Sequence, residues 1–324
     1  MIAAGTSVGD YTVQGFLDAG GMAHVYEAVH SSGTRHAIKV LHATNPEVRK
    51  RLSAEGRMLM RLQHPNIVAV TDVIEIEGVP ALVMELVEGP ALDTWINDEP
   101  RTWPERKTVF KGLMAGMAEA HSRGVVHRDL QPANILVERD AQGNPVARII
   151  DFGLAKNMRQ DSMTQTGSTL GTPGYMSPEQ IRDSKNIDAG SDIFALGCLL
   201  YVLVTEMEPF DGEDNLEVFN NTCDGKYADP EPLAAPEVDR SYIRAIEGCL
   251  RINLEDRIPH AQALEDVILG GELPPPSEDF TLQTDTVRRR GGAGKGRPTQ
   301  AQLWLMSIVA AAVLGSITWI LMTG

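Results

Sequence analysis

The eight residues HRDLQPAN, 127–134, are the most informative stretch of this 324-residue chain. Their H-R-D triplet, followed five positions after the aspartate by Asn134, is typical of a site that transfers phosphoryl groups. One position departs from that pattern, because Gln131 is neutral where such sites usually carry a lysine. The stretch therefore raises the question of whether an altered site still catalyses, and the rest of the chain bears on the answer.

Further motifs flank this stretch, and each of them is weak when it is taken alone. Gly20 and Gly21 between two expected strands are compatible with a plain hairpin turn, and Lys39 is compatible with a surface lysine. Asp151, at the start of D-F-G, is compatible with the end of any strand. Their order is far more specific, because a glycine pair, A-I-K, a helical Glu55, H-R-D, D-F-G and S-P-E follow one another along the chain.

With this succession of motifs, the chain resembles the eukaryotic-like serine/threonine protein kinases, in particular the membrane-anchored bacterial ones. The resemblance covers roughly residues 10–270, and GTPGYMSPEQ (171–180) and HPNIV (64–68) are especially close to the bacterial pattern. It implies an α+β, two-lobed protein-kinase fold. A small β-rich N-lobe over about 10–87 would precede a larger helical C-lobe over about 88–270.

The hydrophobic pattern supports two such parts within the expected kinase domain, residues 1–270. Alternating runs in the first part predict strands, and one segment with helical spacing lies among them. The runs are YTVQGFL (11–17), HVYEAV (24–29), RHAIKVL (35–41), IVAVTDVIEI (67–76) and ALVMELV (81–87), with the helix over 46–63. From about Trp103 onward the pattern is helical. SDIFALGCLLYVLVTE (191–206) is apolar on every face, which predicts the buried central helix of the C-lobe.

The resemblance also implies roles in phosphoryl transfer, a reaction that depends on positioning and on charge neutralisation. Asp129 would orient the substrate hydroxyl and accept its proton. Lys39 would hold the α- and β-phosphates of ATP, and Glu55 would aim Lys39. Asp151 and Asn134 would bind Mg²⁺, or Mn²⁺ in its place. ATP and protein substrates are therefore the expected partners.

The nucleotide site and two structural contacts follow from the same resemblance. The glycine loop would cover the phosphates, and the hinge backbone would bind the adenine edge. The expected ATP-binding residues are Leu17, Gly20, Gly21, Val25, Ala37, Lys39, Met84, Glu85, Val87 and Leu136. Glu179 is expected to pair with Arg257, and Asp192 is expected to support the catalytic loop.

The segment between Asp151 and Glu179 is expected to be regulated by phosphorylation. In related kinases, the arginine beside the catalytic aspartate, here Arg128, pairs with a phosphorylated activation loop. Thr164 and Thr166 match the positions that bacterial relatives use, so they are the predicted autophosphorylation sites.

Three positions depart from the family pattern. Asp18 and Ala23 replace the first and third glycines of the nucleotide loop. Gln131 would replace the lysine at the γ-phosphate with a neutral donor, and charge-assisted hydrogen bonds are about twice as strong as neutral ones. We expect transfer to be ~10- to 100-fold slower for this reason. Because Lys39, Asp129 and the D-F-G aspartate are kept, we favour a working enzyme. The alternative is a pseudokinase or scaffold that binds nucleotide and partners without efficient catalysis.

The composition separates an acidic body from a basic C-terminal region. The formal charge is −15, and residues 1–287 carry 24 Lys and Arg against 44 Asp and Glu. Such an acidic body argues against a nucleic-acid-binding surface. Residues 271–302 are rich in Pro and Gly and include RRRGGAGKGR (288–297), so we expect a flexible basic linker.

The stretch LWLMSIVAAAVLGSITWILM (303–322) contains twenty residues without charge. At about 1.5 Å per residue it would span about 30 Å as a helix, which predicts a C-terminal transmembrane helix in a lipid bilayer. The basic cluster upstream predicts a single-pass protein with its kinase domain on the cytoplasmic side, by resemblance at a bacterial inner membrane. Ser307, Ala311 and Gly315 form a stripe that would let two helices pack as a homodimer. Chance is the simpler explanation of that stripe, because such residues are common in membrane helices.

Overall fold

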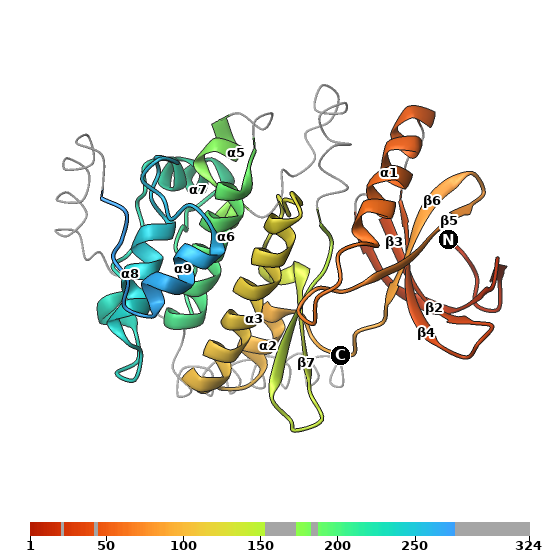
Figure 1. The fold of residues 1–324 in the computed structure, drawn as a ribbon, viewed down its shortest axis with the longest axis horizontal. Coiled ribbons are helices and arrows are strands. Elements are labelled where there is room, and N and C mark those ends of the chain that lie inside the picture. Colours follow the sequence, from red (N-terminus) through yellow and green to blue (C-terminus); the bar gives the residue numbers. More distant parts are fainter. Residues whose placement is uncertain (21–22, 42–44, 153–172, 183–186, 276–324) are drawn as a thin grey trace, which may run out of the picture. The chain divides into compact units, whose positions relative to one another are not determined.

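The computed structural model describes residues 1–20, 23–41, 45–152, 173–182 and 187–275. The N-terminal part contains a six-stranded antiparallel sheet in the order β1-β2-β3-β4-β6-β5 (Figure 1). Its strands are β1 (Ser7–Val8), β2 (Tyr11–Gly20), β3 (Ala23–His30), β4 (Arg35–Leu41), β5 (Val70–Ile76) and β6 (Val79–Glu85). The predicted strands are confirmed with shifted ends, and β1 is an addition, because a two-residue strand carries no readable alternation.

The helix α1 (Pro46–Leu59) packs against β5 and β6. It begins where the Asn45 side chain accepts a hydrogen bond from the Glu47 amide, which satisfies one of the unpaired donors at the helix start. A Cβ on Gly56 would lie 2.6 Å from Cδ2 of Leu82. The glycine therefore allows the helix to approach the sheet closely, and this contact sets the position of Glu55.

The C-terminal part is mainly helical and is built around α6 (Ala189–Thr205). Its other helices within the described ranges are α2 (Leu92–Asp98), α3 (Trp103–Ser122), α5 (Pro178–Arg182), α7 (Asn215–Cys223), α8 (Arg240–Cys249) and α9 (Ala261–Ile268). The α6 residues from Gly190 to Val204 are all buried, and α6 packs against α3 and α8. The prediction of a buried central helix is confirmed.

The catalytic loop leads directly into a short β-hairpin. The 3₁₀ turn Pro132–Asn134 leads into β7 (Ile135–Arg139), which pairs with β8 (Pro145–Ile149). Ile135 lies opposite Ile149, so Asn134 and Asp151 fall at the same end of the hairpin. The HPNIV stretch joins this hairpin to the sheet, because the Val68 amide donates a 2.9 Å hydrogen bond to the carbonyl of Ile149.

Residues Met1–Phe280 form one compact unit. The expected two-lobed α+β architecture is confirmed by the sheet and the helices that it contains. Within the ranges that the structure describes, no helix combines the length and apolarity needed to cross a bilayer. The segment 303–322 lies outside the described residues, and the boundaries of domain, linker and membrane helix stay predictions.

Candidate active site

The catalytic loop is held by a buried aspartate from the central helix. Asp192 accepts hydrogen bonds from the amides of His127, at 2.7 Å, and Arg128, at 2.8 Å. His121 of α3 lies 2.9 Å from the same carboxylate. Arg128 has φ of 67°, a left-handed conformation that costs free energy in a non-glycine residue. The two amide contacts stabilise that conformation, so the predicted support by Asp192 is confirmed.

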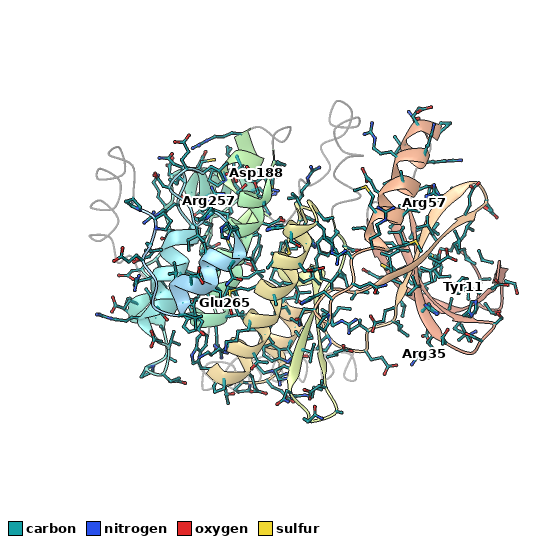
Figure 2. All side chains as sticks on the ribbon, in the orientation of Figure 1. Tyr11, Arg35, Arg57, Asp188, Arg257 and Glu265 are labelled. Atoms are coloured by element: carbon teal, nitrogen blue, oxygen red, sulfur yellow. The ribbon has the colours of Figure 1, made fainter. Side chains whose placement is uncertain are left out.

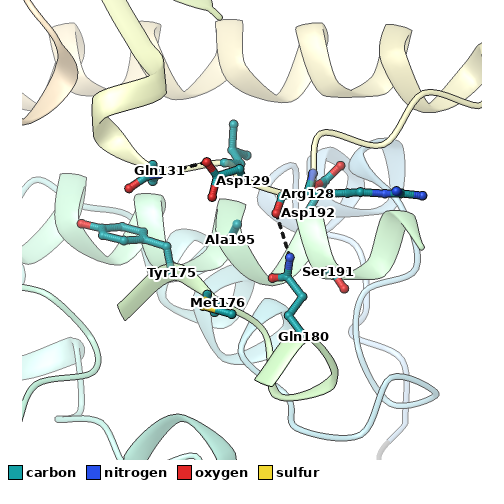
Figure 3. Close-up of a pocket in the computed structure, with 10 residues that line it drawn as sticks. Arg128, Asp129, Gln131, Tyr175, Met176, Gln180, Ser191, Asp192 and Ala195 are labelled. Atoms are coloured by element: carbon teal, nitrogen blue, oxygen red, sulfur yellow. Dashed lines mark hydrogen bonds between the residues drawn. The ribbon is translucent and has the colours of Figure 1, made fainter. Parts of the chain in front are cut away.

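The Asp129 carboxylate accepts hydrogen bonds from two side-chain amides of its own loop, and Figure 3 shows the one from Gln131. Asn134 Nδ2 donates to Oδ2 of Asp129 at 3.2 Å and to its backbone carbonyl at 2.7 Å. Gln131 Nε2 donates to the same Oδ2 at 3.3 Å. Both donors are neutral, so they orient the carboxylate without adding positive charge beside it.

The second aspartate, Asp151, follows β8 and lies beside the lysine of the sheet. Lys39 Nζ is 2.6 Å from Asp151 Oδ1. Asp151 has φ of 64°, which is again a left-handed conformation. Strained aspartates of this kind occur where the surrounding structure fixes a functional side chain. The structure therefore brings the predicted phosphate-binding lysine and the predicted metal-binding aspartate together.

Two hydrogen bonds and one ring contact connect the catalytic loop to the residues on either side of Asp151. The Ile150 amide donates a 3.0 Å hydrogen bond to the carbonyl of Asn134. The His127 ring lies 4.7 Å from the Phe152 ring, and its Nε2 lies 2.8 Å from the Ile150 carbonyl. Gly153, the last residue of D-F-G, lies outside the described residues.

The predicted metal ligands are chemically suitable for Mg²⁺. Asp151 and Asn134 offer a carboxylate and an amide oxygen, which are the hard ligands that this ion prefers. Magnesium is usually held by one or two protein oxygens together with substrate phosphates and water. Among the described residues no group of three His, Cys, Asp or Glu side chains could hold a metal by itself. Two predicted oxygen ligands next to the predicted phosphate-binding lysine fit the usual magnesium arrangement.

The predicted nucleotide residues line neighbouring strands. Val25 of β3 pairs with Lys39 of β4, and Ala37 of β4 pairs with Met84 of β6. Leu136 of β7 forms a bridge with Ala91. The remaining positions are Leu17, which is exposed on β2, Gly20 at the end of β2, Glu85 at the end of β6, and Val87 in the connection to α2. Gly21 lies outside the described residues.

Glu55 lies half-buried on α1. The ion pair that the structure records for Lys39 is with Asp151, so pairing of Glu55 with Lys39 stays a prediction. Thr164 and Thr166, the predicted phosphorylation sites, lie outside the described residues.

The pair of Glu179 and Arg257 was predicted and is confirmed. Nη1 of Arg257 lies 2.7 Å from Oε1 of Glu179, and Nη2 lies 3.0 Å from Oε2. Arg257 is fully buried and also donates to the carbonyl of Gly190, beside Asp188 at the start of α6 (Figure 2). Burial alone would raise the pKa of Glu179, but the hydrogen bonds and charge of Arg257 outweigh it and lower the pKa to about 2.

Two residues of the segment 173–182 were not predicted as parts of the site. The Gln180 side chain donates a 2.8 Å hydrogen bond to the carbonyl of Arg128 and accepts one from the Ser177 amide. Tyr175 lies in the small pocket that Asp129 and Gln131 also line. Their place within GTPGYMSPEQ (171–180) was the available signal, but only the folded chain shows that this segment contacts the catalytic loop.

Comparisons with known proteins agree with this geometry. The family described as "Protein kinase domain" matches residues 11–268. A probable serine/threonine-protein kinase of Streptomyces coelicolor is 34% identical over 252 residues, which cover 74% of this chain and 37% of that protein. The probable serine/threonine-protein kinase PknB of Lactococcus lactis is 37% identical over 225 residues, 67% of this chain and 35% of that protein. The chain thus spans about a third of the length of these relatives.

Solved structures show the same fold. The crystal structure of Rad53 1-466 in complex with AMP-PNP has a TM-score of 0.66 at 25% identity, covering 80% of this chain and 65% of that one. The PknI kinase domain of Mycobacterium tuberculosis has a TM-score of 0.64 at 23% identity, covering 83% and 99%.

Proposed function

The chain belongs to the protein kinase domain family, and we propose that it is a serine/threonine protein kinase that uses ATP to phosphorylate proteins. The observation that carries the proposal is the contact of Asp151 with Lys39, next to the loop in which Asn134 orients Asp129. Asp129 is oriented by Asn134, and Asp151 lies 2.6 Å from Lys39 at the same end of the β7–β8 hairpin. A scaffold that binds no nucleotide would not need a strained aspartate next to a lysine in this position.

In the proposed reaction Asp129 positions the serine or threonine hydroxyl. The hydroxyl oxygen attacks the γ-phosphorus, its proton passes to the Asp129 carboxylate, and ADP leaves with the electrons of the broken P–O bond. A magnesium ion, or manganese in its place, would neutralise phosphate charge when it is held by Asp151 and Asn134.

The remaining residues bind and align ATP in this proposal. Lys39 supplies positive charge to the α- and β-phosphates, and Glu55 on α1 aligns Lys39. The backbone of Gly20 and Gly21 covers the phosphates. Adenine is enclosed by the apolar residues of the paired strands and by the hinge backbone. The adenine-binding set is Leu17, Val25, Ala37, Met84, Glu85, Val87 and Leu136.

The direct test is phosphate transfer by the full chain, purified in detergent. With radiolabelled ATP and Mg²⁺ it is expected to label itself and a general acceptor protein, whereas Asp129→Asn is expected to label neither. The alternative is a pseudokinase that binds nucleotide and partners, which the neutral Gln131 and the altered residues Asp18 and Ala23 would suit. Nucleotide binding without any transfer by the wild type would favour that alternative.

We propose further that Thr164 and Thr166 are the autophosphorylation sites and that Arg128 contacts the phosphorylated segment. Mass spectrometry of protein incubated with ATP is expected to find phosphate at these threonines. The double alanine variant is expected to lose most of its activity toward other proteins. Full activity of that variant would contradict the assignment.

Anchoring of the chain by residues 303–322 is also a proposal. Its support is the uncharged length of that segment and the basic cluster before it. The kinase domain would then face the cytoplasm. Cell fractionation is expected to recover the chain with membranes, and protease added to the outside of intact cells is expected to leave residues 1–270 undigested. Recovery in the soluble fraction would contradict membrane anchoring.

A further inference from the structure

The peptide bond that precedes Asp129 is held at both of its polar ends. The carbonyl of Arg128 accepts a 2.8 Å hydrogen bond from Nε2 of Gln180, a residue of α5 (Figure 3). The amide of Asp129 donates a 3.3 Å hydrogen bond to Nδ1 of the His127 ring. Because the plane of this peptide bond helps to set the direction in which the Asp129 side chain leaves the backbone, both contacts bear on the position of the proposed base.

Arg128 needs this support, because its backbone lies in the left-handed region with φ of 67°. Such a conformation costs free energy in a non-glycine residue and persists only where the surrounding contacts fix it. Asp192 of α6 holds the Arg128 amide at 2.8 Å, and Gln180 holds the Arg128 carbonyl. Asp192 is 1% exposed and Gln180 is 5% exposed. The strained residue is therefore fixed by one buried side chain at its donor and by another at its acceptor.

The chemistry of the two contacts requires an amide side chain at position 180. Oε1 of Gln180 accepts a 2.9 Å hydrogen bond from the Ser177 amide, while Nε2 donates to the Arg128 carbonyl. Both partners are backbone groups, so one can only donate and the other can only accept, which fixes the orientation of the side-chain amide. An ionised carboxylate could only accept, and an apolar side chain could make neither bond. Glutamine meets both demands.

The helix that carries Gln180 is itself fixed to the C-lobe. Glu179, the preceding residue, forms the ion pair with the buried Arg257. Ser191 of α6 donates a 2.7 Å hydrogen bond to the Glu179 carboxylate, and its hydroxyl lies 3.1 Å from the Ser177 hydroxyl. Gln180 therefore reaches the catalytic loop from a rigid support, which the precise placement of a reactive group requires.

We propose that Gln180 is a positioning residue for Asp129, which sets the orientation of the base by holding the Arg128 carbonyl against α5. The inference rests on the proposed kinase function, because that function makes Asp129 the group that orients the substrate hydroxyl. In this assignment Gln180 acts through Arg128 and contacts no reacting atom. Without it the Arg128 carbonyl loses its partner and the peptide bond before Asp129 can turn. The effect falls on the transfer step and not on nucleotide binding.

The first test compares the full chain, purified in detergent, with Gln180→Met and Gln180→Glu. Methionine keeps the length of the side chain but makes neither hydrogen bond, and an ionised glutamate keeps the shape but cannot donate. With saturating acceptor protein, kcat of both variants is expected to fall about 10- to 100-fold, as for a small misplacement of a catalytic group. Their KM for ATP is expected to stay unchanged. The matched control is Gln14→Glu, at an exposed side chain of β2 that also donates to a backbone carbonyl, and it is expected to behave like wild type.

The pH dependence of Gln180→Glu gives a readout that a loss of packing would not change. When its carboxyl group is protonated, the hydroxyl can donate to the Arg128 carbonyl while the other oxygen still accepts. The ratio of its kcat to that of wild type is therefore expected to rise as pH falls, whereas the ratio for Gln180→Met is expected to stay constant. The charged groups beside position 180 are Arg128, Asp129, Glu179 and Asp192, and they cancel in the ratio because all three proteins contain them.

These results separate the positioning role from the kinase function. Wild-type kcat in Gln180→Met, or a ratio for Gln180→Glu that does not change with pH, would overturn the proposal while leaving the kinase function intact. Thermal unfolding of both variants is expected to show one transition above the assay temperature. Failure of both variants to fold would show that Gln180 serves the fold and not the position of Asp129, which would also overturn the proposal.

Hydrogen exchange gives a measurement that does not depend on catalysis. The amides of His127 and Arg128 are bonded to Asp192, and mass spectrometry of peptides covering 127–134 reports their exchange. Exchange is expected to be about three- to tenfold faster in Gln180→Met than in wild type, as for the loss of one hydrogen bond. If this difference is found but wild type transfers no phosphate, the kinase proposal fails and the hold of Gln180 on the catalytic loop stands. Equal exchange in the two proteins would overturn that hold in either case.

Discussion

At the scale of single residues, Gln131 is where the catalytic loop departs most from its family. Its amide donates to the oxygen of Asp129 that also accepts from Asn134, so it retains an orienting contact but not a charge. We predict that Gln131→Lys leaves phosphoryl transfer unchanged or makes it faster, by up to ~10- to 100-fold if the charge is fully recovered. Steady-state kinetics with ATP and an acceptor protein measure this effect.

Asp129→Asn and Lys39→Met serve as the inactive references in that assay, because they remove the proposed base and the proposed phosphate-binding charge. Both are expected to abolish transfer. A sharp drop with Gln131→Lys would show that the neutral amide has a specific role at Asp129.

The ion pair of Glu179 and Arg257 makes stability depend on pH. The pKa of Glu179 is lowered from 4.5 to about 2 in the folded chain, so the folded state binds its proton less readily than the unfolded state does. The resulting stability is present above pH 4.5 and is lost as pH falls toward 2. At about 1.4 kcal/mol per unit the loss is at most about 3 kcal/mol. Urea unfolding between pH 6 and the acid limit of folding measures it.

Glu179→Gln is expected to reduce that pH dependence. It is also expected to lower the free energy of unfolding near neutral pH by about 3–5 kcal/mol, because Arg257 is fully buried and would keep its charge without a partner. Glu237→Gln, an exposed carboxylate, is the matched control and is expected to behave like wild type. If the free energy of unfolding of Glu179→Gln falls with pH as steeply as that of wild type, other carboxylates cause the pH dependence.

At the scale of elements, the connection between β6 and α2 lies directly against β7. A Cβ on Gly89 would be 2.3 Å from the carbonyl oxygen and 2.7 Å from the carbonyl carbon of Val137, and backbone atoms cannot yield as a flexible side chain does. Gly89→Ala is therefore predicted to cost about 1–3 kcal/mol of stability. It is also predicted to raise KM for ATP, because Val87 and Leu136 belong to the proposed adenine site.

Gly15→Ala is the control for this substitution. An added Cβ at Gly15 would have no atom within 4 Å, so its stability is expected to stay within about 0.5 kcal/mol of wild type. Thermal unfolding and ATP titrations of the two variants make the comparison. An unchanged KM for ATP in Gly89→Ala would separate the packing of β7 from nucleotide binding.

At the scale of the whole molecule, we predict that the segment 303–322 associates two copies of the chain. Leucines at Ala311 and Gly315 would block close approach along the stripe of small residues. This variant is expected to associate less in membranes, measured by energy transfer between labelled copies. It is also expected to autophosphorylate more slowly at Thr164 and Thr166, because a shared anchor raises the effective concentration of one kinase domain near another.

The control places leucines at Val309 and Val313, which lie off the stripe on the same segment. It is expected to associate and to autophosphorylate like wild type. If the Ala311 and Gly315 variant does so as well, the segment acts only as an anchor.

Much of the fold could be predicted because its signals are local. The apolar run of α6 predicted its burial, and the alternating runs predicted the larger strands, since side-chain periodicity depends on neighbouring residues alone. The hairpin β7–β8 and the strand β1 escaped prediction. The hairpin was hidden among helical segments, and the two residues of β1 are too short to show a period.

By itself, the sequence determined the family resemblance and the identities of the proposed catalytic residues, because motif order and residue chemistry are written along the chain. Only the tertiary structure decided which side chains meet. It placed Lys39 beside Asp151, gave Gln131 and Asn134 the same oxygen of Asp129, and set the Gln180 side chain against the carbonyl of Arg128. The first and last of these contacts join residues far apart in the chain, and all three depend on side-chain geometry that no local pattern records. They form only when the packed lobes fix those side chains in place.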